Sequence, residues 1–184
     1  MSKTRVALFI GSLRRDSFNR RLARAIEKLA PDDFEFAHVR IDNLPLYSQD
    51  FDADYPAEAA RLKQDIEAAD AVLFVTPEYN RSIPGVLKNA IDIGSRPWGT
   101  NSFAGKPAGV LGISIGAIGT ALAQQHLRNV LAYLDAPTLG QPEVFMQMKD
   151  GLIDDDGHIG SDDTRKFLQD YVDRYVAWVK KHAG

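Results

Sequence analysis

Short apolar runs alternate with amphipathic stretches along this chain. Runs of about five apolar residues, or alternating apolar and polar positions, predict strands, whereas apolar residues three or four positions apart predict helices. Strands are therefore expected at 6–10, 34–41, 71–75, 108–115 and within 138–148. Helices are expected at 19–30, 56–69, 85–93, 120–134 and from 161 to about 180.

This alternation is typical of a parallel sheet with helices on both faces. Right-handed crossovers leave few topologies, and the flavodoxin-like strand order 2-1-3-4-5 fits best. The run 34–41 alternates in polarity, which indicates a sheet edge and agrees with that order. The predicted fold is a flavodoxin-like three-layer α/β sandwich with a five-stranded parallel sheet. Residues 1–184 are expected to form a single domain because no linker or repeat divides them.

Composition excludes several function classes. The chain has no cysteine, which rules out disulfides, thiolate metal sites and cysteine nucleophiles. The histidines show no metal-ligand spacing, so no metal site is expected. A net charge of −3 gives no general attraction to nucleic acid or anionic lipid. No apolar run approaches the roughly 20 residues that span a bilayer. The first strand begins without a signal-peptide core, so a cytoplasmic location is expected.

Ligands of such sheets bind beyond the carboxyl ends of the strands, near the switch point between the first and third strands. Three segments follow strands at this edge, namely 11–19, 77–84 and 114–120. These three loops are therefore the candidate site on topology alone.

The loop 11–19 joins a buried strand to the start of a helix. Its hydrogen-bonding and charged side chains include Ser12, Arg14, Arg15, Ser17 and Asn19. Several donors and a cation at the positive end of a helix suit a dianionic monophosphate. The dinucleotide pattern Gly-x-Gly-x-x-Gly is absent, because Leu13 and Asp16 stand where it needs glycine. A helix cap formed by Ser17 or Asn19, with solvated arginines, is the alternative interpretation.

The loop 77–84 follows a strand that is buried on both faces. Tyr79 offers a flat apolar face with a polar tip, which suits an aromatic ring system. Asn80 and the backbone of Glu78 and Tyr79 can meet the hydrogen-bonding edge of a heterocycle. A plain connection with Pro84 in the first helical turn explains the same residues.

The third loop contains the nucleophile-elbow pattern Gly-Ile-Ser-Ile-Gly around Ser114. A serine hydrolase would use Ser114 as nucleophile, with Asp135 and either His158 or His182 downstream. However, the helical pattern resumes only near Thr120, whereas an elbow leads directly into its helix. The alternative is a glycine-rich turn that lets a ligand approach the backbone, with Ser114 as a hydrogen-bond donor.

Three motifs in these loops resemble one known family. They are Gly-Ser-Leu-Arg-(x)2-Ser-x-Asn at 11–19, Pro-Glu-Tyr-Asn-x-Ser-Ile-Pro-Gly-(x)2-Lys-Asn-Ala-Ile-Asp at 77–92, and Ala-Gly-Lys-Pro-Ala with Ser-x-Gly-(x)2-Gly at 104–119. Together they resemble the NADPH-dependent FMN reductase family, most closely its bacterial quinone/chromate reductase branch. The resemblance implies a flavodoxin-like fold, bound FMN, and transfer of two electrons from NADPH or NADH to quinones, chromate or free flavin. It also implies a homodimer or homotetramer.

The resemblance further implies which residues contact the cofactor. In the first loop these are Ser12, Leu13, Arg14, Ser17, Phe18 and Asn19, of which Ser12, Arg14, Ser17 and Asn19 would hold the phosphate. Pro77, Glu78, Tyr79 and Asn80 would border the isoalloxazine ring, and Ser114 and Gly116 would lie near the flavin. The chain departs from many relatives at Ile93, where they carry Trp, and at Thr120, where they carry Gly. The second departure leaves open the shape of the pocket wall where a nicotinamide or acceptor would stack.

The flavin would carry the chemistry, so no catalytic acid or base is expected. We expect a ping-pong cycle in which the nicotinamide leaves before the acceptor binds on the same face. Arg81 either attracts the phosphates of the dinucleotide or is simply solvated. For the oligomer, Arg128 and Tyr133 on the helix 120–134 could pair across a symmetric contact, although an ordinary core-facing helix explains them equally. An electron carrier without NAD(P)H activity and a binding protein without cofactor stay open.

Overall fold

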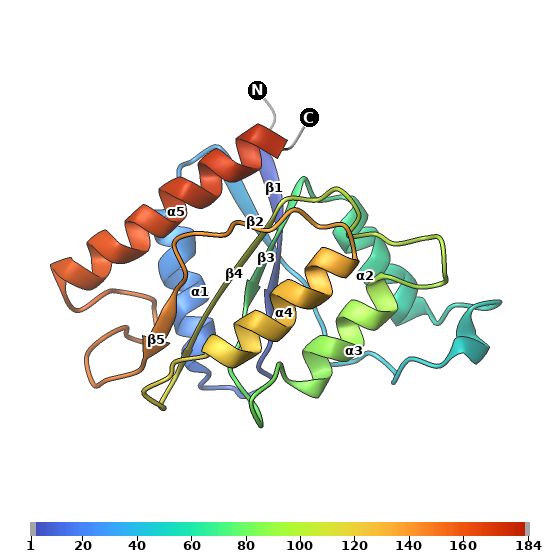
Figure 1. The fold of residues 1–184 in the computed structure, drawn as a ribbon, viewed down its shortest axis with the longest axis horizontal. Coiled ribbons are helices and arrows are strands. Elements are labelled where there is room, and N and C mark those ends of the chain that lie inside the picture. The colour runs from blue at the N-terminus through green and yellow to red at the C-terminus, as the bar shows by residue number, and fades with distance from the viewer. Residues whose placement is uncertain (1–2, 183–184) are drawn as a thin grey trace.

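The computed structural model describes residues 3–182, and its centre is a five-stranded sheet (Figure 1). The strands are β1 (Thr4–Ile10), β2 (Phe34–His38), β3 (Ala71–Val75), β4 (Ala108–Ser114) and β5 (Phe145–Gln147). Every neighbouring pair is parallel and the order is β2-β1-β3-β4-β5. The predicted flavodoxin-like topology is therefore confirmed.

Helices fill the crossovers between these strands. They are α1 (Phe18–Leu29), α2 (Ala57–Glu67), α3 (Gly85–Gly94), α4 (Ala121–Tyr133) and α5 (Asp162–His182), with a short 3₁₀ helix at Gln49–Phe51. The Ser161 hydroxyl accepts a hydrogen bond from the Thr164 amide at 3.2 Å, so it caps α5 as expected. Among residues 3–182, no helix is long and apolar enough to cross a membrane.

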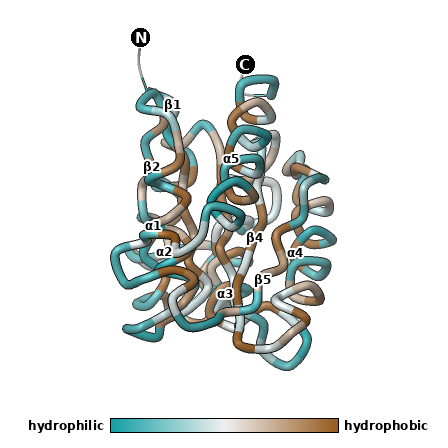
Figure 2. Tube along the Cα trace, turned by 90° about the vertical axis from the view of Figure 1, so that its left-hand side faces the viewer, coloured by the Kyte–Doolittle hydropathy of each residue, from teal (hydrophilic) through white to brown (hydrophobic). Residues whose placement is uncertain are grey.

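The sheet separates two apolar cores, because successive side chains of a strand point to opposite faces. Leu8 of β1 packs with α1 and α5, while its neighbour Phe9 packs with α2, α3 and α4. All five residues of β3 are buried, as expected for a strand covered on both faces. Figure 2 shows the same division, with brown segments inside and teal on the outer turns of the helices.

Two predicted strands are shorter in the structure. β2 ends at His38 rather than 41, although the Val39 amide still donates to the Leu8 carbonyl at 2.9 Å and Val39 and Ile41 pack in the core. The region 138–148 yields only the short β5, and Thr138 contributes a single bridge to Ala108. Pro142 lies in between and has no amide hydrogen to donate to a ladder. Both changes fall at sheet edges, where a strand has a neighbour on one side only.

Buried tyrosines should make the fold sensitive to alkaline pH. Burial raises the pKa of Tyr55 to about 12, and its hydroxyl donates to the Ile93 carbonyl at 2.7 Å. Burial also raises the pKa of Tyr171 and Tyr175 in α5. Unfolded tyrosine ionises near pH ~10, so the unfolded state loses its protons first and stability should fall as pH rises from about 10 towards 12. Urea unfolding between about pH 10 and 12 measures this fall in the free energy of unfolding. The fall should be smaller in Tyr55→Phe than in the parent protein. A free energy of unfolding that stays constant over this pH range would contradict the raised tyrosine pKa values.

Candidate functional site

The loops after β1, β3 and β4 meet at the carboxyl edge of the sheet, at the bottom of Figure 1. The Gly11 amide donates to the Val75 carbonyl at 2.9 Å, and the Thr76 amide donates to the Leu111 carbonyl at 3.0 Å. These bonds continue the sheet ladder into the loops. The three segments chosen from topology therefore lie side by side.

Gly11 allows the first two loops to come this close. A Cβ at this position would lie 3.0 Å from Thr76 Oγ1 and 3.3 Å from Pro77 Cδ. Contacts this short would require the Thr76 and Pro77 side chains to shift by a few tenths of an ångström. A side chain at position 11 would therefore disturb both segments of the site at once.

The start of α1 is left open for an anion. Ser17 is the N-cap residue, but its side chain forms no capping hydrogen bond, and the first turn contains no acidic residue. The first N–H groups of a helix have no partner within the helix and form its positive end. Ser12 and Ser17 are both buried beside this end. A helix cap formed by Ser17, the alternative interpretation, is absent here.

Asn19 instead ties α1 to β4. Its Nδ2 donates to the Ile113 carbonyl at 2.9 Å, and its Oδ1 accepts from the Ile113 amide at 3.1 Å. One amide hydrogen remains for a ligand. The pairing places the helix start next to Ser114 in the third loop. Asn19 is thus an anchor between two loops, and phosphate binding by Asn19 stays a prediction.

Phe18 supports the charged side chains of the first loop. The Arg14 guanidinium lies 4.8 Å from the centre of the Phe18 ring, and that of Arg21 lies 5.5 Å from it. Such cation–π contacts restrict a flexible arginine. Leu13, also predicted to contact the cofactor, is about half exposed at the same loop.

The second loop contains a tight turn that the sequence did not reveal. Tyr79 and Ser82 exchange two backbone hydrogen bonds of 2.9 and 3.0 Å. Asn80 and Arg81 between them have φ angles of +51° and +65°, as a two-residue turn of type I′ requires. Asparagine tolerates this conformation, but arginine rarely adopts it. The turn holds the Tyr79 side chain 53% exposed, beside the first and third loops.

Glu78 joins the second loop to α4. Its Oε2 accepts from the amides of Leu122 and Ala123, at 3.0 and 3.1 Å. Thr120, the N-cap residue of α4, provides no side-chain cap. The carboxylate therefore satisfies two free amides and lies at the positive end of the helix. The sequence did not reveal this cap, because Glu78 lies 44 residues before the amide of Leu122.

The third loop is held by its own serine. Ser114 Oγ donates to the Gly119 carbonyl, and the Ser114 carbonyl accepts from the Met148 amide at 2.7 Å. Gly119 has φ +68°, and a Cβ there would lie 2.7 Å from the Phe145 backbone. Gly116, by contrast, is exposed with free space around it. The loop is thus tightly fixed at its ends and open at its tip.

The two positions at which this chain differs from many members of the family, Thr120 and Ile93, are both buried in the interior. Thr120 has no exposed surface, and its Oγ1 accepts from Gln124 Nε2 at 2.8 Å. It therefore packs beneath the third loop, and its effect on the shape of the pocket wall stays a prediction. Ile93, a residue of α3, is buried in the core that α3 shares with α2. Both substitutions are absorbed by packing.

Ser114 has no catalytic partners among residues 3–182. The Asp135 carbonyl accepts from Gly105 at the opposite end of β4, roughly 20 Å away over seven strand residues. His158 Nδ1 pairs with Asp154, and His182 Nδ1 contacts the Trp178 carbonyl. Neither histidine contacts Ser114. The hydrolase interpretation was therefore wrong.

Ser114→Ala gives a direct check on this conclusion. We expect no hydrolysis of p-nitrophenyl acetate above background by either the parent or the variant. The variant should lose about 1 kcal/mol of unfolding free energy, because the Gly119 carbonyl loses its donor. Esterase activity that disappears on this substitution would restore the hydrolase.

Large apolar side chains are exposed around the three loops. Leu13, Tyr79, Ile115 and Ile118 have exposed fractions of 48, 53, 75 and 48%. Their gathering at one edge provides apolar surface suited to an aromatic ligand. Sequence reasoning named the first two and missed the isoleucines. Ile115 and Ile118 flank glycine and alanine in a loop, and this pattern gives no signal of their exposure.

Comparison with known proteins agrees with this geometry. The chain is 56% identical over 176 residues to a 2-hydroxy-1,4-benzoquinone reductase from Burkholderia sp, covering 96% of each. It is 41% identical over 175 residues to an NAD(P)H-dependent FMN reductase from Pseudomonas aeruginosa, covering 95% of this chain and 94% of the relative.

Solved structures point the same way. FerB from Paracoccus denitrificans, a flavoenzyme NAD(P)H:(acceptor) oxidoreductase, superposes with a TM-score of 0.94 at 47% identity, covering 97% of this chain and 98% of FerB. A flavodoxin from Pseudomonas aeruginosa, 18% identical with a TM-score of 0.60, shares the fold. The model of the NADPH-dependent FMN reductase family matches residues 4–151. The chain therefore belongs to the NADPH-dependent FMN reductase family.

Proposed function

We propose that residues 1–184 form one FMN-binding domain that transfers two electrons from NADPH or NADH to quinones. The observation that carries this proposal is the uncapped, acid-free start of α1 next to the exposed ring of Tyr79. A phosphate anchor and an aromatic platform at adjacent strand ends suit a flavin mononucleotide. The quinone reductase named among the relatives supports the choice of acceptor.

The first loop would hold the FMN phosphate. The free amides at the start of α1 and the hydroxyls of Ser12 and Ser17 would donate to its oxygens, and Arg14 would neutralise its charge. Phe18 would keep the Arg14 guanidinium in place through the ring contact. The charge-assisted bonds would fix the cofactor at one end while its ring extends over the neighbouring loop.

The second and third loops would hold the ring. Bound FMN supplies hydride acceptance and release, and the protein supplies position and an apolar setting. Tyr79 would lie along the ring, with Pro77, Asn80 and the backbone of Glu78 at its polar edge. Ser114 and Gly116 would lie close by, and Ile115 would limit access of water. The Glu78 bonds to α4 would keep both loops at a fixed separation.

The exposed apolar side chains of the three loops form a single open surface. The nicotinamide donor and the electron acceptor would therefore bind there one after the other. The nicotinamide would contact it first and leave, and the acceptor would then contact the same surface. Such a surface selects weakly for shape, so free flavin and chromate are also proposed as acceptors. Reduced nicotinamide nucleotides are intracellular metabolites, so we infer a cytoplasmic location.

Steady-state kinetics of the FMN-loaded protein test this function. NADPH and NADH should each be oxidised in the presence of 1,4-benzoquinone, free FMN or chromate, with parallel double-reciprocal lines. Bound flavin without NAD(P)H oxidation would favour an electron carrier. A protein that shows no flavin absorbance after incubation with FMN would be a binding protein of another kind, and both flavin functions would be wrong.

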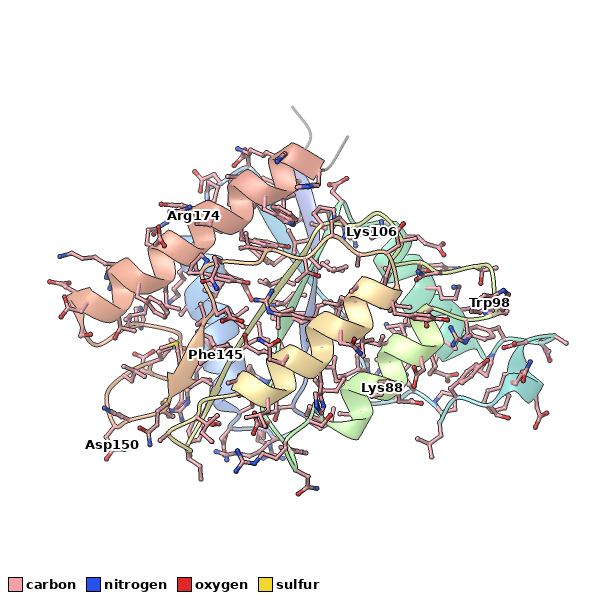
Figure 3. All side chains as sticks on the ribbon, in the orientation of Figure 1. Lys88, Trp98, Lys106, Phe145, Asp150 and Arg174 are labelled. Atoms are coloured by element: carbon pink, nitrogen blue, oxygen red, sulfur yellow. The ribbon has the colours of Figure 1, made fainter. Side chains whose placement is uncertain are left out.

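We also propose a homodimer or homotetramer that uses the outer face of α3 and α4. Trp98 and Tyr133 are 78% and 68% exposed there, and Figure 3 shows Trp98 projecting away from the sheet. Both line a cavity of about 390 Å³ with Arg96. Arg128, which could pair across the contact, donates to the Leu139 carbonyl of its own chain at 2.6 Å. Its pairing with a second subunit stays a prediction.

Charged residues on this face should separate the subunits. Trp98→Lys combined with Tyr133→Lys should reduce the mass measured by light scattering towards the monomer value. Phe167→Lys, which alters an exposed aromatic on α5, is the matched control and should leave the mass unchanged. A parent protein that is monomeric at micromolar concentration would contradict the oligomer.

A further inference from the structure

A groove runs beside the first loop, between α1 and β2. It has a volume of about 280 Å³, and its lining includes Leu8, Ile10, Ser12, Arg20 and Arg40. Figure 2 shows α1, β1 and β2 together at this side of the molecule. Apolar strand residues thus lie between guanidinium groups from a helix and from a sheet edge. This groove adjoins the FMN phosphate loop through Ser12 and Leu13, whereas Tyr79 and Ser114, which would border the flavin ring, do not line it.

Arg20 has no partner among residues 3–182. Its side chain is only partly exposed, its Nε is buried without a hydrogen bond, and no carboxylate pairs with it. Its neighbours differ, because Arg21 pairs with Asp155 at 2.6 Å and Arg24 donates to the Asp155 carbonyl. A partly buried guanidinium without an ion pair is stabilised by a nearby anion. An anionic ligand in the groove would supply that pair.

Two other polar side chains of the groove have partners within the chain. Arg40 Nε donates to Asp42 at 2.7 Å, which leaves its remaining guanidinium N–H groups for a ligand. His38 Nε2 lies 2.7 Å from Glu27. Arg20 also lines a second cavity with Ser17, in which Asp16 and Asp155 stand beside the arginines. Because Asp155 pairs with Arg21 and Asp42 with Arg40, Arg20 is the lining arginine of the groove that has no ion pair among residues 3–182.

An apolar floor flanked by arginines suits a purine base that carries a phosphate. Adjacent strands lie roughly 4.8 Å apart, so β2 is about 10 Å from β3 and about 15 Å from β4. A dinucleotide whose nicotinamide reaches the ring-bordering loops would extend across this distance. We propose that the groove binds the adenosine 2′-phosphate of NADPH, with Arg20 as its main ligand and Arg40 as the second, and so favours NADPH over NADH. This proposal rests on the proposed function.

Binding measurements test the groove independently of catalysis. Adenosine 2′,5′-bisphosphate should bind the FMN-loaded protein at least about tenfold more tightly than 5′-AMP, measured by calorimetry. Arg20→Ala should remove most of that difference, and Arg20→Lys should retain part of it. Arg5→Ala, the same change of charge at the far end of β1, is the control and should behave as the parent. Equal affinity for the two nucleotides would overturn the proposal. Inorganic phosphate that binds as tightly as the bisphosphate would overturn it as well.

Kinetics give the second readout. In Arg20→Ala the KM for NADPH should rise about tenfold with little change in kcat, whereas the KM for NADH should change less than about threefold. Equal effects on both nucleotides would contradict a 2′-phosphate site. An equally large loss of FMN affinity would assign Arg20 to the flavin phosphate instead. If neither NADPH nor NADH is oxidised but the bisphosphate still binds more tightly than 5′-AMP, the proposed function is wrong and the 2′-phosphate site is supported.

Discussion

Ser17→Asp is expected to stabilise the fold and yet abolish tight FMN binding. An aspartate at the N-cap of α1 would accept from the free amides, which should raise the unfolding free energy by about 0.5–1 kcal/mol. The same carboxylate would occupy the phosphate position and repel the dianion. Two like charges about 4 Å apart near a surface interact by about 4 kcal/mol, so FMN affinity should fall at least about 100-fold. Urea unfolding and flavin fluorescence titration measure the two effects.

Riboflavin is the control, because it carries the ring without the phosphate. The parent should bind FMN much more tightly than riboflavin, and Ser17→Asp should bind the two similarly. Ser17→Asn, a neutral capping residue, should weaken FMN less than the aspartate does. A Ser17→Asp protein that keeps its preference for FMN would place the phosphate elsewhere.

Glu78→Ala is expected to destabilise the protein by about 2–3 kcal/mol. The substitution removes the acceptor of two amide hydrogen bonds at the start of α4 and leaves both amides without a partner. It also removes a negative charge from the positive helix end. Urea denaturation at neutral pH measures the loss. Glu78→Gln keeps an oxygen acceptor in place and should cost about 1 kcal/mol.

The same pair of variants tests the link between the loops. FMN affinity should fall by about tenfold in Glu78→Ala and much less in Glu78→Gln, since only the first frees the second loop from α4. If both variants bind FMN as the parent does, Glu78 stabilises α4 without positioning the ring-bordering loop.

The strands, their order and the three site loops could be predicted from local pattern. β3 has an uninterrupted apolar run because helices cover both of its faces. The strand ends then follow from the rules of parallel sheets, which bring distant loops to one edge. The motifs at 11–19 and 77–92 added the family and its cofactor, now supported by the comparisons.

Contacts between distant residues were not predictable. Asn19 pairs with Ile113 across 94 positions, and Glu78 caps a helix that begins more than 40 residues later. No local spacing signals either bond. Arg20 is one of three arginines in α1, with Arg21 and Arg24. Only the structure shows that Asp155 pairs with Arg21 and that Arg20 has no ion pair within residues 3–182.

Anaerobic half-reactions test the central claim most directly. An equimolar amount of NADPH added to the FMN-loaded protein should bleach the visible flavin absorbance, and an equimolar amount of 1,4-benzoquinone should then restore it without any NADPH remaining. This result would show that the bound flavin carries both electrons between two substrates that never meet. Flavin absorbance that is unchanged by NADPH, or that the quinone does not restore, would contradict the account.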